Sequence, residues 1–443
     1  MHIPEYVQNL MNVLENAGFE AWAVGGCVRD AALGIEPHDY DLCTNALPDQ
    51  TRALFEDHQL VLAGLKHGTV AVVTEHDVVE ITTFRTEGDY SDNRHPGWVN
   101  FVKTIEEDLS RRDFTVNAMA YSPLRGYADP FGGLEDLKHK RLRAVGDPVA
   151  RFEEDSLRIL RGARFAARFG MKIDPATREA MESQRGLMDG LARERVFSEL
   201  TKFFLKADAE LIVDMAPILV QVIPELGRCV GFDQKNPHHR YDVFTHMAKV
   251  TGRLPEEAEL RFAGMLHDIG KPHSMTMDSR GVGHFKGHDL VSAQMADDIL
   301  RRLKAPTAFR EEVVWLVENH MALYAPERRS VRRALSRHGI ARLRSLTALQ
   351  RADVGGKGVG GKNDRVQRLA DFIAMAEEMA AHEGQMSLKK LAVKGEDLSA
   401  LGYPKSREMG AALNRLLELV IAEELPNERQ ALLGCAARWL EEA

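Results

Sequence analysis

A turn of two glycines between an apolar run and a helical run is the feature that most constrains how this chain can fold. Residues 24–30 read VGGCVRD. The apolar run at 21–24 predicts a strand, and the residues from Val28 predict the start of a helix. Gly25 and Gly26 would let backbone N–H groups approach a phosphate with no Cβ in the way, and Arg29 adds a fixed positive fork.

Two aspartates follow this turn at close range. Asp39 and Asp41 alternate across Tyr40, so on a strand both carboxylates project from the same face. Such a pair can hold two Mg²⁺ ions that clamp a nucleoside triphosphate and an attacking hydroxyl group. Either motif alone would be read as a surface turn or as two solvated acids, but their succession favours nucleotidyl transfer.

Length and composition set broad limits. With 443 residues and 44% hydrophobic residues, the chain is typical of a soluble globular protein of roughly two to four domains. No apolar run approaches the ~20 residues that span a bilayer, and the N-terminus lacks the features of a signal peptide. The scattered cysteines form no CxxC pair, which predicts a reducing, cytoplasmic location. They are Cys27, Cys43, Cys229 and Cys435.

The net charge of −8 argues against a general nucleic-acid coat protein. Residues 326–370 nevertheless hold twelve Lys and Arg against three acidic residues. A solvated helix face and a contact with a phosphate backbone are about equally good readings of this run.

Secondary-structure patterns change along the chain. The first 140 residues mix helical runs at 6–17 and 49–55 with strand-like runs at 70–74, 78–84 and 99–103. Residues 85–98 read as a polar loop between two strands. Beyond residue 140 strand patterns nearly vanish. We therefore predict an α+β fold, with a small α/β head followed by helices only.

Further charged residues could complete the first site. Glu80 lies on a β-rich run and is either a third acid beside the Asp39/Asp41 strand or a solvated strand residue. Arg111 and Arg112 precede Asp113, and the arginines could bind a triphosphate while the aspartate orients one of them.

A stripe of charge follows at residues 151–168, which are predicted to form one helix. Asp155, Arg158 and Arg161 are spaced by three residues, and Arg164 lies slightly off the same line. An Asp–Arg pair offers acceptors and donors that could read the Watson–Crick edge of cytosine or adenine. A salt bridge on a solvated helix is the alternative. Three stacked arginines would repel one another unless an anion lies among them.

The ordered set of motifs resembles the class II tRNA nucleotidyltransferases, which comprise the CCA-adding enzymes and the related bacterial poly(A) polymerases. The resemblance covers about residues 20–200. Its motifs are GGCVRD at 25–30, Asp39-x-Asp41, RRDFT at 111–115, DPFGGLEDL at 129–137 and RFEED-x-x-R at 151–158.

This resemblance implies a polymerase-beta-like head and a role for each residue. Asp39 and Asp41 would bind Mg²⁺, and residues 85–98 would match a flexible loop linked to the switch from C to A addition. Residues 191–200, with Glu194, Arg195 and Glu199, would support the nucleotide pocket. Phosphate and nucleotide contacts are expected from Gly25, Gly26, Arg29, Arg112, Asp155, Arg158, Arg161 and Arg164.

The second half resembles the HD phosphohydrolases. His246, the adjacent His267 and Asp268, and the distant Asp353 follow the order of that family. His288 and His320 lie between them, where two-metal members supply extra ligands. Imidazoles mixed with carboxylates suit a divalent transition metal such as Ni²⁺, Co²⁺ or Mn²⁺.

Other candidate features receive no role at this point. Lone histidines on helices are usually structural, and those set aside here are His238, His239, His273 and His284. Residues 356–363 nearly spell a phosphate-binding loop, but Asn363 replaces the Ser/Thr that binds Mg²⁺. We read that segment as a flexible basic loop.

Together these patterns predict four domains. They are a nucleotidyltransferase head at 1–140, a nucleotide-selecting helical neck at 141–205, an HD body at 206–380 and a helical tail at 381–443. The expected activity is addition and repair of the 3′-terminal CCA of tRNA from CTP and ATP, with tRNA as partner. No membrane and no protein partner is indicated.

Three other readings stay open. A narrower relative would add only A or only CC, or make poly(A). An alarmone synthetase-hydrolase also joins an HD domain to a transferase, but there the HD domain comes first and the Asp155/Arg158 stripe would be idle. A non-catalytic RNA-binding scaffold would not need both Asp39 and Asp41.

Overall fold

The computed structural model describes residues 1–87, 99–358, 363–382 and 388–441. The chain divides into two compact units. The first comprises Met1–Ala207 and Asp214–Pro224, and the second comprises Asp208–Val213 and Glu225–Ala443. The finer division into four domains stays a prediction. Among the described residues, no helix is both long enough and apolar enough to cross a bilayer.

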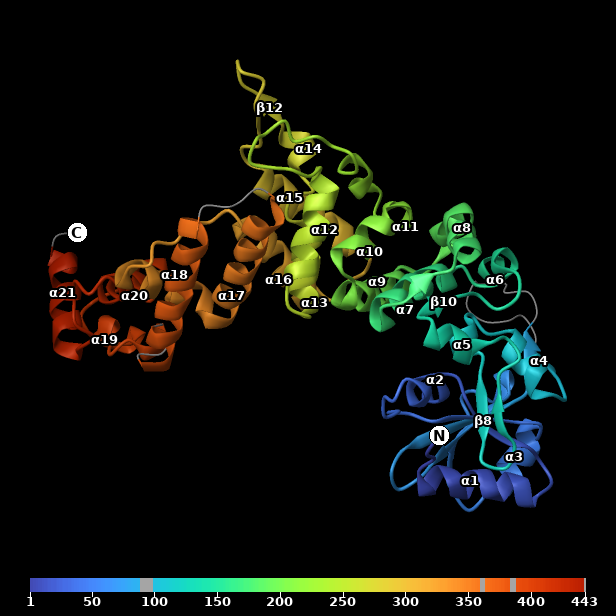
Figure 1. The fold of residues 1–443 in the computed structure, drawn as a ribbon. Coiled ribbons are helices and arrows are strands. Elements are labelled where there is room, and N and C mark those ends of the chain that lie inside the picture. Colours follow the sequence, from blue (N-terminus) through green and yellow to red (C-terminus); the bar gives the residue numbers. More distant parts are fainter. Residues whose placement is uncertain (88–98, 359–362, 383–387, 442–443) are drawn as a thin grey trace. The chain divides into compact units, whose positions relative to one another are not determined.

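A seven-stranded sheet in the order β3-β4-β5-β2-β1-β8-β9 forms the centre of the N-terminal part (Figure 1). β2 and β5 run parallel, whereas the other neighbours are antiparallel. The strands are β1 Ala21–Val24, β2 Asp41–Thr44, β3 Gln59–Val61, β4 Thr69–Val73, β5 Val78–Thr83, β8 Ala120–Ser122 and β9 Gly126–Ala128. The strands predicted at 21–24, 70–74 and 78–84 are thereby confirmed.

Beside this sheet, β6 Arg85–Glu87 and β7 Val99–Phe101 form an antiparallel pair. The prediction of a loop over 85–98 is thus wrong for residues 85–87, which form β6. Residues 88–98, the rest of that predicted loop, lie outside the described residues.

Short helices cover the sheet. α1 (Glu5–Asn16) buries Val7, Leu10, Met11 and Leu14, a spacing of three and four residues that puts one apolar stripe against β1 and α3. The other helices of this region are α2 Gly26–Ala32, α3 Pro48–Leu54, α4 Ile105–Ser110 and α5 Gly133–Lys138, with 3-10 turns η1 Leu65–His67 and η2 Thr115–Asn117.

The rest of the first unit is helical, apart from the two-residue strands β10 Arg141–Leu142 and β11 Lys172–Ile173. α7 packs along α9. The helices are α6 Pro148–Glu154, α7 Leu157–Phe169, α8 Pro175–Ser183, η3 Arg185–Gly190, α9 Arg193–Lys206 and α11 Ala216–Val222.

The prediction of one helix over 151–168 is wrong. α6 ends before Asp155, whose backbone is extended with φ −142°, and α7 begins at Leu157. The Asp155 carboxylate accepts the Leu157 N–H at 3.0 Å. The side chain thus bonds the start of the next helix, which is the usual way in which aspartate competes with a continuous helix.

Helices α12, α13, α15, α16 and α17 pack against one another in the second unit (Figure 1). Among the residues of this unit that the structure describes, the strands are the short pair β12 Thr276–Met277 and β13 Gly283–His284. The helices are α10 Ala209–Asp214, η4 Pro224–Arg228, α12 Val243–Arg253, α13 Ala258–Leu266, α14 Lys271–Ser274, α15 His288–Arg302, α16 Thr307–Asn319, α17 Arg328–Gly356, α18 Asn363–His382, η5 Leu388–Lys390, α19 Gly395–Ala400, α20 Arg407–Ile421 and α21 Arg429–Glu441.

Candidate functional site

One cavity of about 840 Å³ lies in the first unit, and every catalytic or nucleotide-binding residue predicted from the sequence lines it. These residues come from segments more than a hundred positions apart in the chain. They are Gly25, Gly26, Arg29, Asp39, Asp41, Glu80, Arg112, Asp155, Arg158, Arg161 and Arg164.

Three carboxylates gather at one end of the parallel strand pair. Asp41 begins β2 and is the register partner of Glu80 on β5, while Asp39 precedes the strand. Reduced hydration, Glu80 and Asp39 raise the pKa of Asp41 to about 6, and Arg112 opposes the shift. Acids that resist joint ionisation in this way form a centre that favours a bound cation.

The glycine turn brings Arg112 close to the chain. Gly25 has φ +70°, and a Cβ there would stand 2.8 Å from Arg112 Nη1. The absence of a side chain therefore allows the guanidinium group to lie against the turn, beside Asp41.

Asp108 positions both arginines of the Arg111–Arg112 pair. Its fully buried carboxylate lies 3.0 Å from Arg111 Nη2 and 3.2 Å from Arg112 Nη2. Sequence reasoning missed this residue, although it stands three and four positions before the arginines, as a helical ion pair would.

Asp113 accepts hydrogen bonds from Arg161 of α7 and does not only orient the arginine that precedes it in the sequence. Its Oδ2 accepts from Arg161 Nε at 2.8 Å and Nη2 at 2.5 Å. Burial raises the pKa of the Asp113 carboxyl, but Arg161 and Asn117 outweigh it and lower the pKa to about 2.

Arg158, Arg161 and Arg164 of α7 each face a carboxylate of the protein itself. The anions expected among these arginines are therefore supplied by the protein, from three other segments, and their repulsion alone does not indicate a bound nucleotide. The pairs are Arg158–Glu154 at 2.7 Å, Arg161–Asp113 at 2.5 Å and Arg164–Glu199 at 3.2 Å. Glu199 lies on α9, within the motif that was expected to support the pocket.

Asp155 and Arg158 are held by fixed groups. Arg158 donates to the main-chain carbonyls of Arg111 at 2.9 Å and Arg151 at 3.2 Å. Asp155 Oδ2 lies 3.5 Å from Arg195 Nη2. The two side chains thus keep their positions at the cavity wall.

Arg29 is nearly buried and connects the glycine turn to the helical region. It donates to Asn117 Oδ1 at 2.5 Å and its guanidinium carbon lies 4.6 Å from the ring centre of Phe169. It still lines the cavity, so its contact with a triphosphate stays a prediction.

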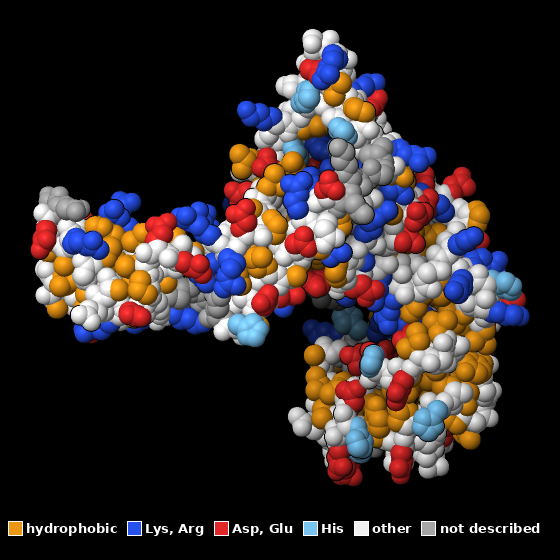
Figure 2. Space-filling model, turned by 60° about the vertical axis from the view of Figure 1, so that its left-hand side comes forward, with side chains coloured by type: hydrophobic (Ala, Val, Ile, Leu, Met, Phe, Trp, Pro, Cys, Tyr) orange, Lys and Arg blue, Asp and Glu red, His pale blue; other side chains and the backbone are white. Residues whose placement is uncertain are grey.

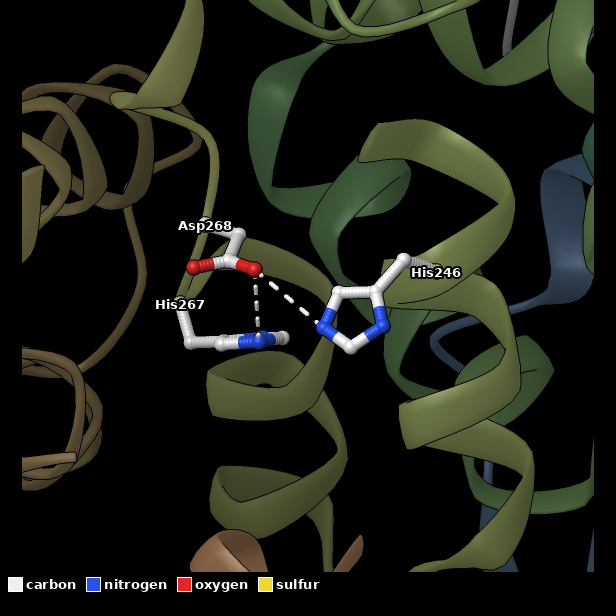
Figure 3. Close-up of side chains that lie close together, drawn as sticks. All are labelled: His246, His267 and Asp268. Carbon is white, nitrogen blue, oxygen red and sulfur yellow. Dashed lines mark ion pairs between the residues drawn. The ribbon is translucent and has the colours of Figure 1, made fainter. Parts of the chain in front are cut away.

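A second candidate site lies in the second unit, where histidines surround Asp268 (Figure 3). His246 on α12 and His267, directly after α13, each bring Nε2 to 3.2 Å from Asp268 Oδ2. Asp353 of α17 approaches the same His246 nitrogen at 3.2 Å through its Oδ1.

The other carboxylate oxygen of Asp268 faces a second pair of histidines. His288, the first residue of α15, lies 3.1 Å from Asp268 Oδ1, and His320, directly after α16, lies 3.7 Å from it. Their Nε2 atoms are 3.2 Å apart. Asp268 therefore stands between two ligand groups, each small enough to enclose one metal ion.

The imidazole rings present the correct nitrogen for metal binding. Nδ1 of three rings lies by the carbonyl three residues earlier, with His267 to Gly264 at 2.9 Å, His288 to Phe285 at 2.7 Å and His320 to Val317 at 2.6 Å. Such a bond leaves Nε2 as the ligand atom. Nε2 of His246 and of His267 are buried and make no well-formed hydrogen bond to any described residue.

Charge also suits a cation here. Burial opposes ionisation of Asp268, but His267, Lys271 and His246 hold its pKa well below the ordinary value. His246 and Lys357 likewise overcome burial and lower the pKa of Asp353. Both carboxyl groups are therefore ionised, as a metal ligand would have to be.

His239, which the sequence analysis set aside, lies beside this cluster. Its ring is perpendicular to that of His246, with centres 5.5 Å apart. Burial, followed by Lys271, lowers its pKa to about 3. The chain turns back between these residues, which no local pattern predicts.

Five arginines of the basic run at 326–370 pair with acids from other segments. Red and blue side chains alternate over the C-terminal helices (Figure 2). The pairs are Arg329–Glu424, Arg332–Glu423, Arg333–Glu418, Arg342–Glu312 and Arg344–Glu377. This pairing favours the reading as a solvated helix face over a continuous phosphate-binding stripe.

Comparison with known proteins agrees with these two sites. Residues 21–143 match the family described as "Poly A polymerase head domain", residues 170–225 match "Probable RNA and SrmB- binding site of polymerase A", and residues 238–354 match "HD domain".

Curated relatives match just under half of the chain. A CCA-adding enzyme of Streptococcus pyogenes serotype M2 (strain MGAS10270) is 48% identical over 208 residues, which are 46% of this chain and 51% of that protein. The CCA-adding enzyme of Streptococcus suis (strain 05ZYH33) is 46% identical over 207 residues, also 46% and 51%. The chain thus spans about half the length of the curated relatives it matches.

Solved structures extend the likeness of the fold. The Bacillus stearothermophilus CCA-adding enzyme in complex with CTP matches with a TM-score of 0.73 at 24% identity, over 99% of each chain. The Thermotoga maritima CCA-adding enzyme complexed with tRNA matches with a TM-score of 0.59 at 20% identity, over 98% of this chain and 95% of that one. The chain therefore contains one region similar to a poly A polymerase head domain and another similar to an HD domain, and just under half of it is similar in sequence to CCA-adding enzymes.

Proposed function

We propose that this protein adds and repairs the 3′-terminal CCA of tRNA, using CTP and ATP and no nucleic-acid template. The observation that carries the proposal is the single cavity in which Asp39, Asp41 and Glu80 lie with the Asp155/Arg158 pair. Acids that can hold metal and a donor–acceptor pair that can read a base are the two requirements of selective nucleotidyl transfer. The sequence similarity to CCA-adding enzymes supports it.

In this reaction the 3′-hydroxyl of tRNA attacks the α-phosphate of CTP twice and of ATP once, and pyrophosphate leaves each time. Mg²⁺ held by Asp39 and Asp41 would position the attack and stabilise the developing charge. Arg112, fixed by Asp108, would bind the triphosphate, and the Asp155/Arg158 pair would select the base. The free, buried cysteines support a cytoplasmic setting.

The decisive test is incorporation of labelled CTP and ATP into tRNA that ends at the discriminator base. Addition of C, C and A in order is the expected result. Incorporation of only A, only CC or a poly(A) tract would replace the proposal with the matching narrower activity. No incorporation into any tRNA substrate, with tRNA binding intact, would favour the non-catalytic RNA-binding scaffold.

We also propose a metal-dependent phosphohydrolase in the second unit, which would use two divalent transition-metal ions such as Ni²⁺, Co²⁺ or Mn²⁺. Its support is the arrangement of imidazoles, since Nδ1 contacts with main-chain carbonyls leave Nε2 of three histidines directed at Asp268. His246, His267 and Asp353 would hold one ion, His288 and His320 the other, and Asp268 would bridge them.

Metal analysis of the full chain after reconstitution tests this site, together with an assay of cyclic phosphodiester hydrolysis in the presence of each metal. We expect bound metal and activity that chelation removes. Bound metal without hydrolysis would make the centre structural or regulatory, and no bound metal would refute it.

A further inference from the structure

Two lysines form ion pairs with the carboxylates of the histidine cluster. Lys271 Nζ lies 2.7 Å from Asp268 Oδ2, the same oxygen that His246 and His267 approach. Lys357 Nζ lies 3.3 Å from Asp353 Oδ2. Each carboxylate that could bind metal therefore has an ammonium group as a close partner.

Burial and several contacts fix the Lys271 side chain within the site. Its side chain is only 6% exposed, Nζ also donates to Gln234 Oε1 at 2.9 Å, and the ammonium lies 5.3 Å from the centre of the Phe285 ring. Lys357 is 22% exposed and follows the end of α17, in the segment that resembles a phosphate-binding loop. Lys357 of that segment thus belongs to the histidine cluster.

At Asp268 a metal ion and the Lys271 ammonium would compete for the same oxygen, Oδ2. At Asp353 His246 approaches Oδ1 and Lys357 approaches Oδ2, so a metal ion and Lys357 would share one carboxylate charge. Metal binding would therefore remove counter-charge from both lysines, at the greater cost for Lys271, which is buried. A phosphoryl group bound at the metals would restore the balance, because its oxygens accept charge-assisted hydrogen bonds from lysine.

We propose that Lys271 and Lys357 act as exchangeable cations that bind Asp268 and Asp353 before metal binds and bind the phosphate of the substrate afterwards. Metal binding and phosphate binding would then each strengthen the other, as linkage requires. The inference rests on the proposed metal site and assigns its substrate a phosphate group that the two lysines contact.

Calorimetric titration of the full chain with Mn²⁺, with and without inorganic phosphate, tests this coupling. All proteins carry Asp39→Asn and Asp41→Asn, so that the transferase cavity does not take up the metal. We compare Lys271→Met and Lys357→Met with a matched control, Lys249→Met. Lys249 is 23% exposed and pairs with Glu210 outside the cluster. Thermal unfolding checks that each variant is folded.

Phosphate should tighten Mn²⁺ binding by at least ~5-fold in the parent and in the control. Without phosphate, each cluster variant should bind Mn²⁺ more tightly than the parent, because a competing cation is gone. With phosphate, the same variants should show little further gain. Lys357→Met, at the more exposed position, keeps the test open if Lys271→Met does not fold.

The outcomes separate the inference from the function on which it rests. Mn²⁺ binding with equal phosphate coupling in every variant, or with no coupling in the parent, would overturn the role of the lysines and leave the metal site standing. Weaker Mn²⁺ binding by Lys357→Met without phosphate would overturn the competition. No Mn²⁺ binding by the parent would refute the metal site itself.

Discussion

Arg112 Nη1 lies 2.8 Å from the point at which a Cβ on Gly25 would stand. Asp108 fixes the guanidinium group from the other side, at 3.2 Å. The turn, the arginine and the acid thus form one unit beside Asp41, in which a single added carbon would displace the cation.

Replacement of Gly25 by alanine should raise the KM for CTP and ATP and lower stability by ~1–3 kcal/mol, the cost of a strained backbone. Gly18→Ala is the control, because Gly18 has φ +86° with nothing within 4 Å of its Cβ position. It shares the strain but displaces no arginine. Equal KM values for the two variants would contradict a role for the contact between Gly25 and Arg112.

Asp39→Ala and Asp41→Ala should each abolish incorporation of both CTP and ATP, because both residues line the cavity as candidate metal ligands. Binding of tRNA, measured by filter retention, should persist. Asp57→Ala, at an exposed site outside the cavity, serves as the control. If both variants kept a substantial fraction of the parental rate, the metal would have to bind elsewhere.

Asp155→Ala or Arg158→Ala should relax discrimination against UTP and GTP, since a lost base contact costs ~1–3 kcal/mol. Competition between nucleotides in single-addition assays measures the change. Arg185→Ala, an exposed arginine outside the cavity, should leave the ratio unchanged. Full activity with full selectivity in either cavity variant would reduce the pair to a structural ion pair.

Stability should depend on pH through Asp41. Reduced hydration, Glu80 and Asp39 raise its pKa to about 6, above the ordinary value of ~3.9. The protonated form is therefore favoured in the folded protein, and its stabilising contribution, complete below ~pH 4, is lost as the pH rises through 6.

Asp41→Asn should accordingly be more stable than the parent at ~pH 8, by about 1 kcal/mol, because solvent screening of an exposed carboxylate reduces the effect. The difference should shrink to nothing near ~pH 4. Urea unfolding across this range, without divalent ions, measures it. A parent that is the more stable protein at the higher pH would show that the sign is wrong.

The double change His267→Ala and Asp268→Ala should remove metal binding by the second unit and leave CCA addition largely intact. His238→Ala, an exposed histidine of the same unit, should change neither property. Metal analysis, thermal unfolding with Mn²⁺ and the incorporation assay are read together. Loss of CCA addition by a folded double variant would mean that both sets of residues serve one active site.

Local patterns predicted the residues that are fixed by local geometry. β1 and the glycine turn lie close together in sequence, so their placement follows from strand and turn preferences. The expectation of Asp39 and Asp41 on one strand is only half right, because β2 begins at Asp41. The sequence left Glu80 open between a third acid and a solvated residue, and the register of β2 and β5 brings it to Asp41.

Contacts between distant segments were not predictable in this way. Arg164 is neutralised by Glu199, and Arg329 by Glu424, but a sequence shows the cations without their partners. The extended backbone at Asp155 was not predicted either, because the charged residues keep a helical spacing across the break between α6 and α7. The contact between the rings of His239 and His246 could not be predicted because it depends on the path of the chain before α12 begins.

The pairs of Arg158, Arg161 and Arg164 with carboxylates along α7 bear on how ionic strength should affect the proposed nucleotidyl transfer. Because each of these guanidinium groups has its own counter-charge, the part of the cavity wall that would contact the base has oriented hydrogen-bonding groups but little net electrostatic potential. Added salt should therefore weaken capture of the triphosphate and of RNA, which depends on unbalanced charge, while the preference for one base over another changes little. Affinity and fidelity would then be adjustable independently of each other.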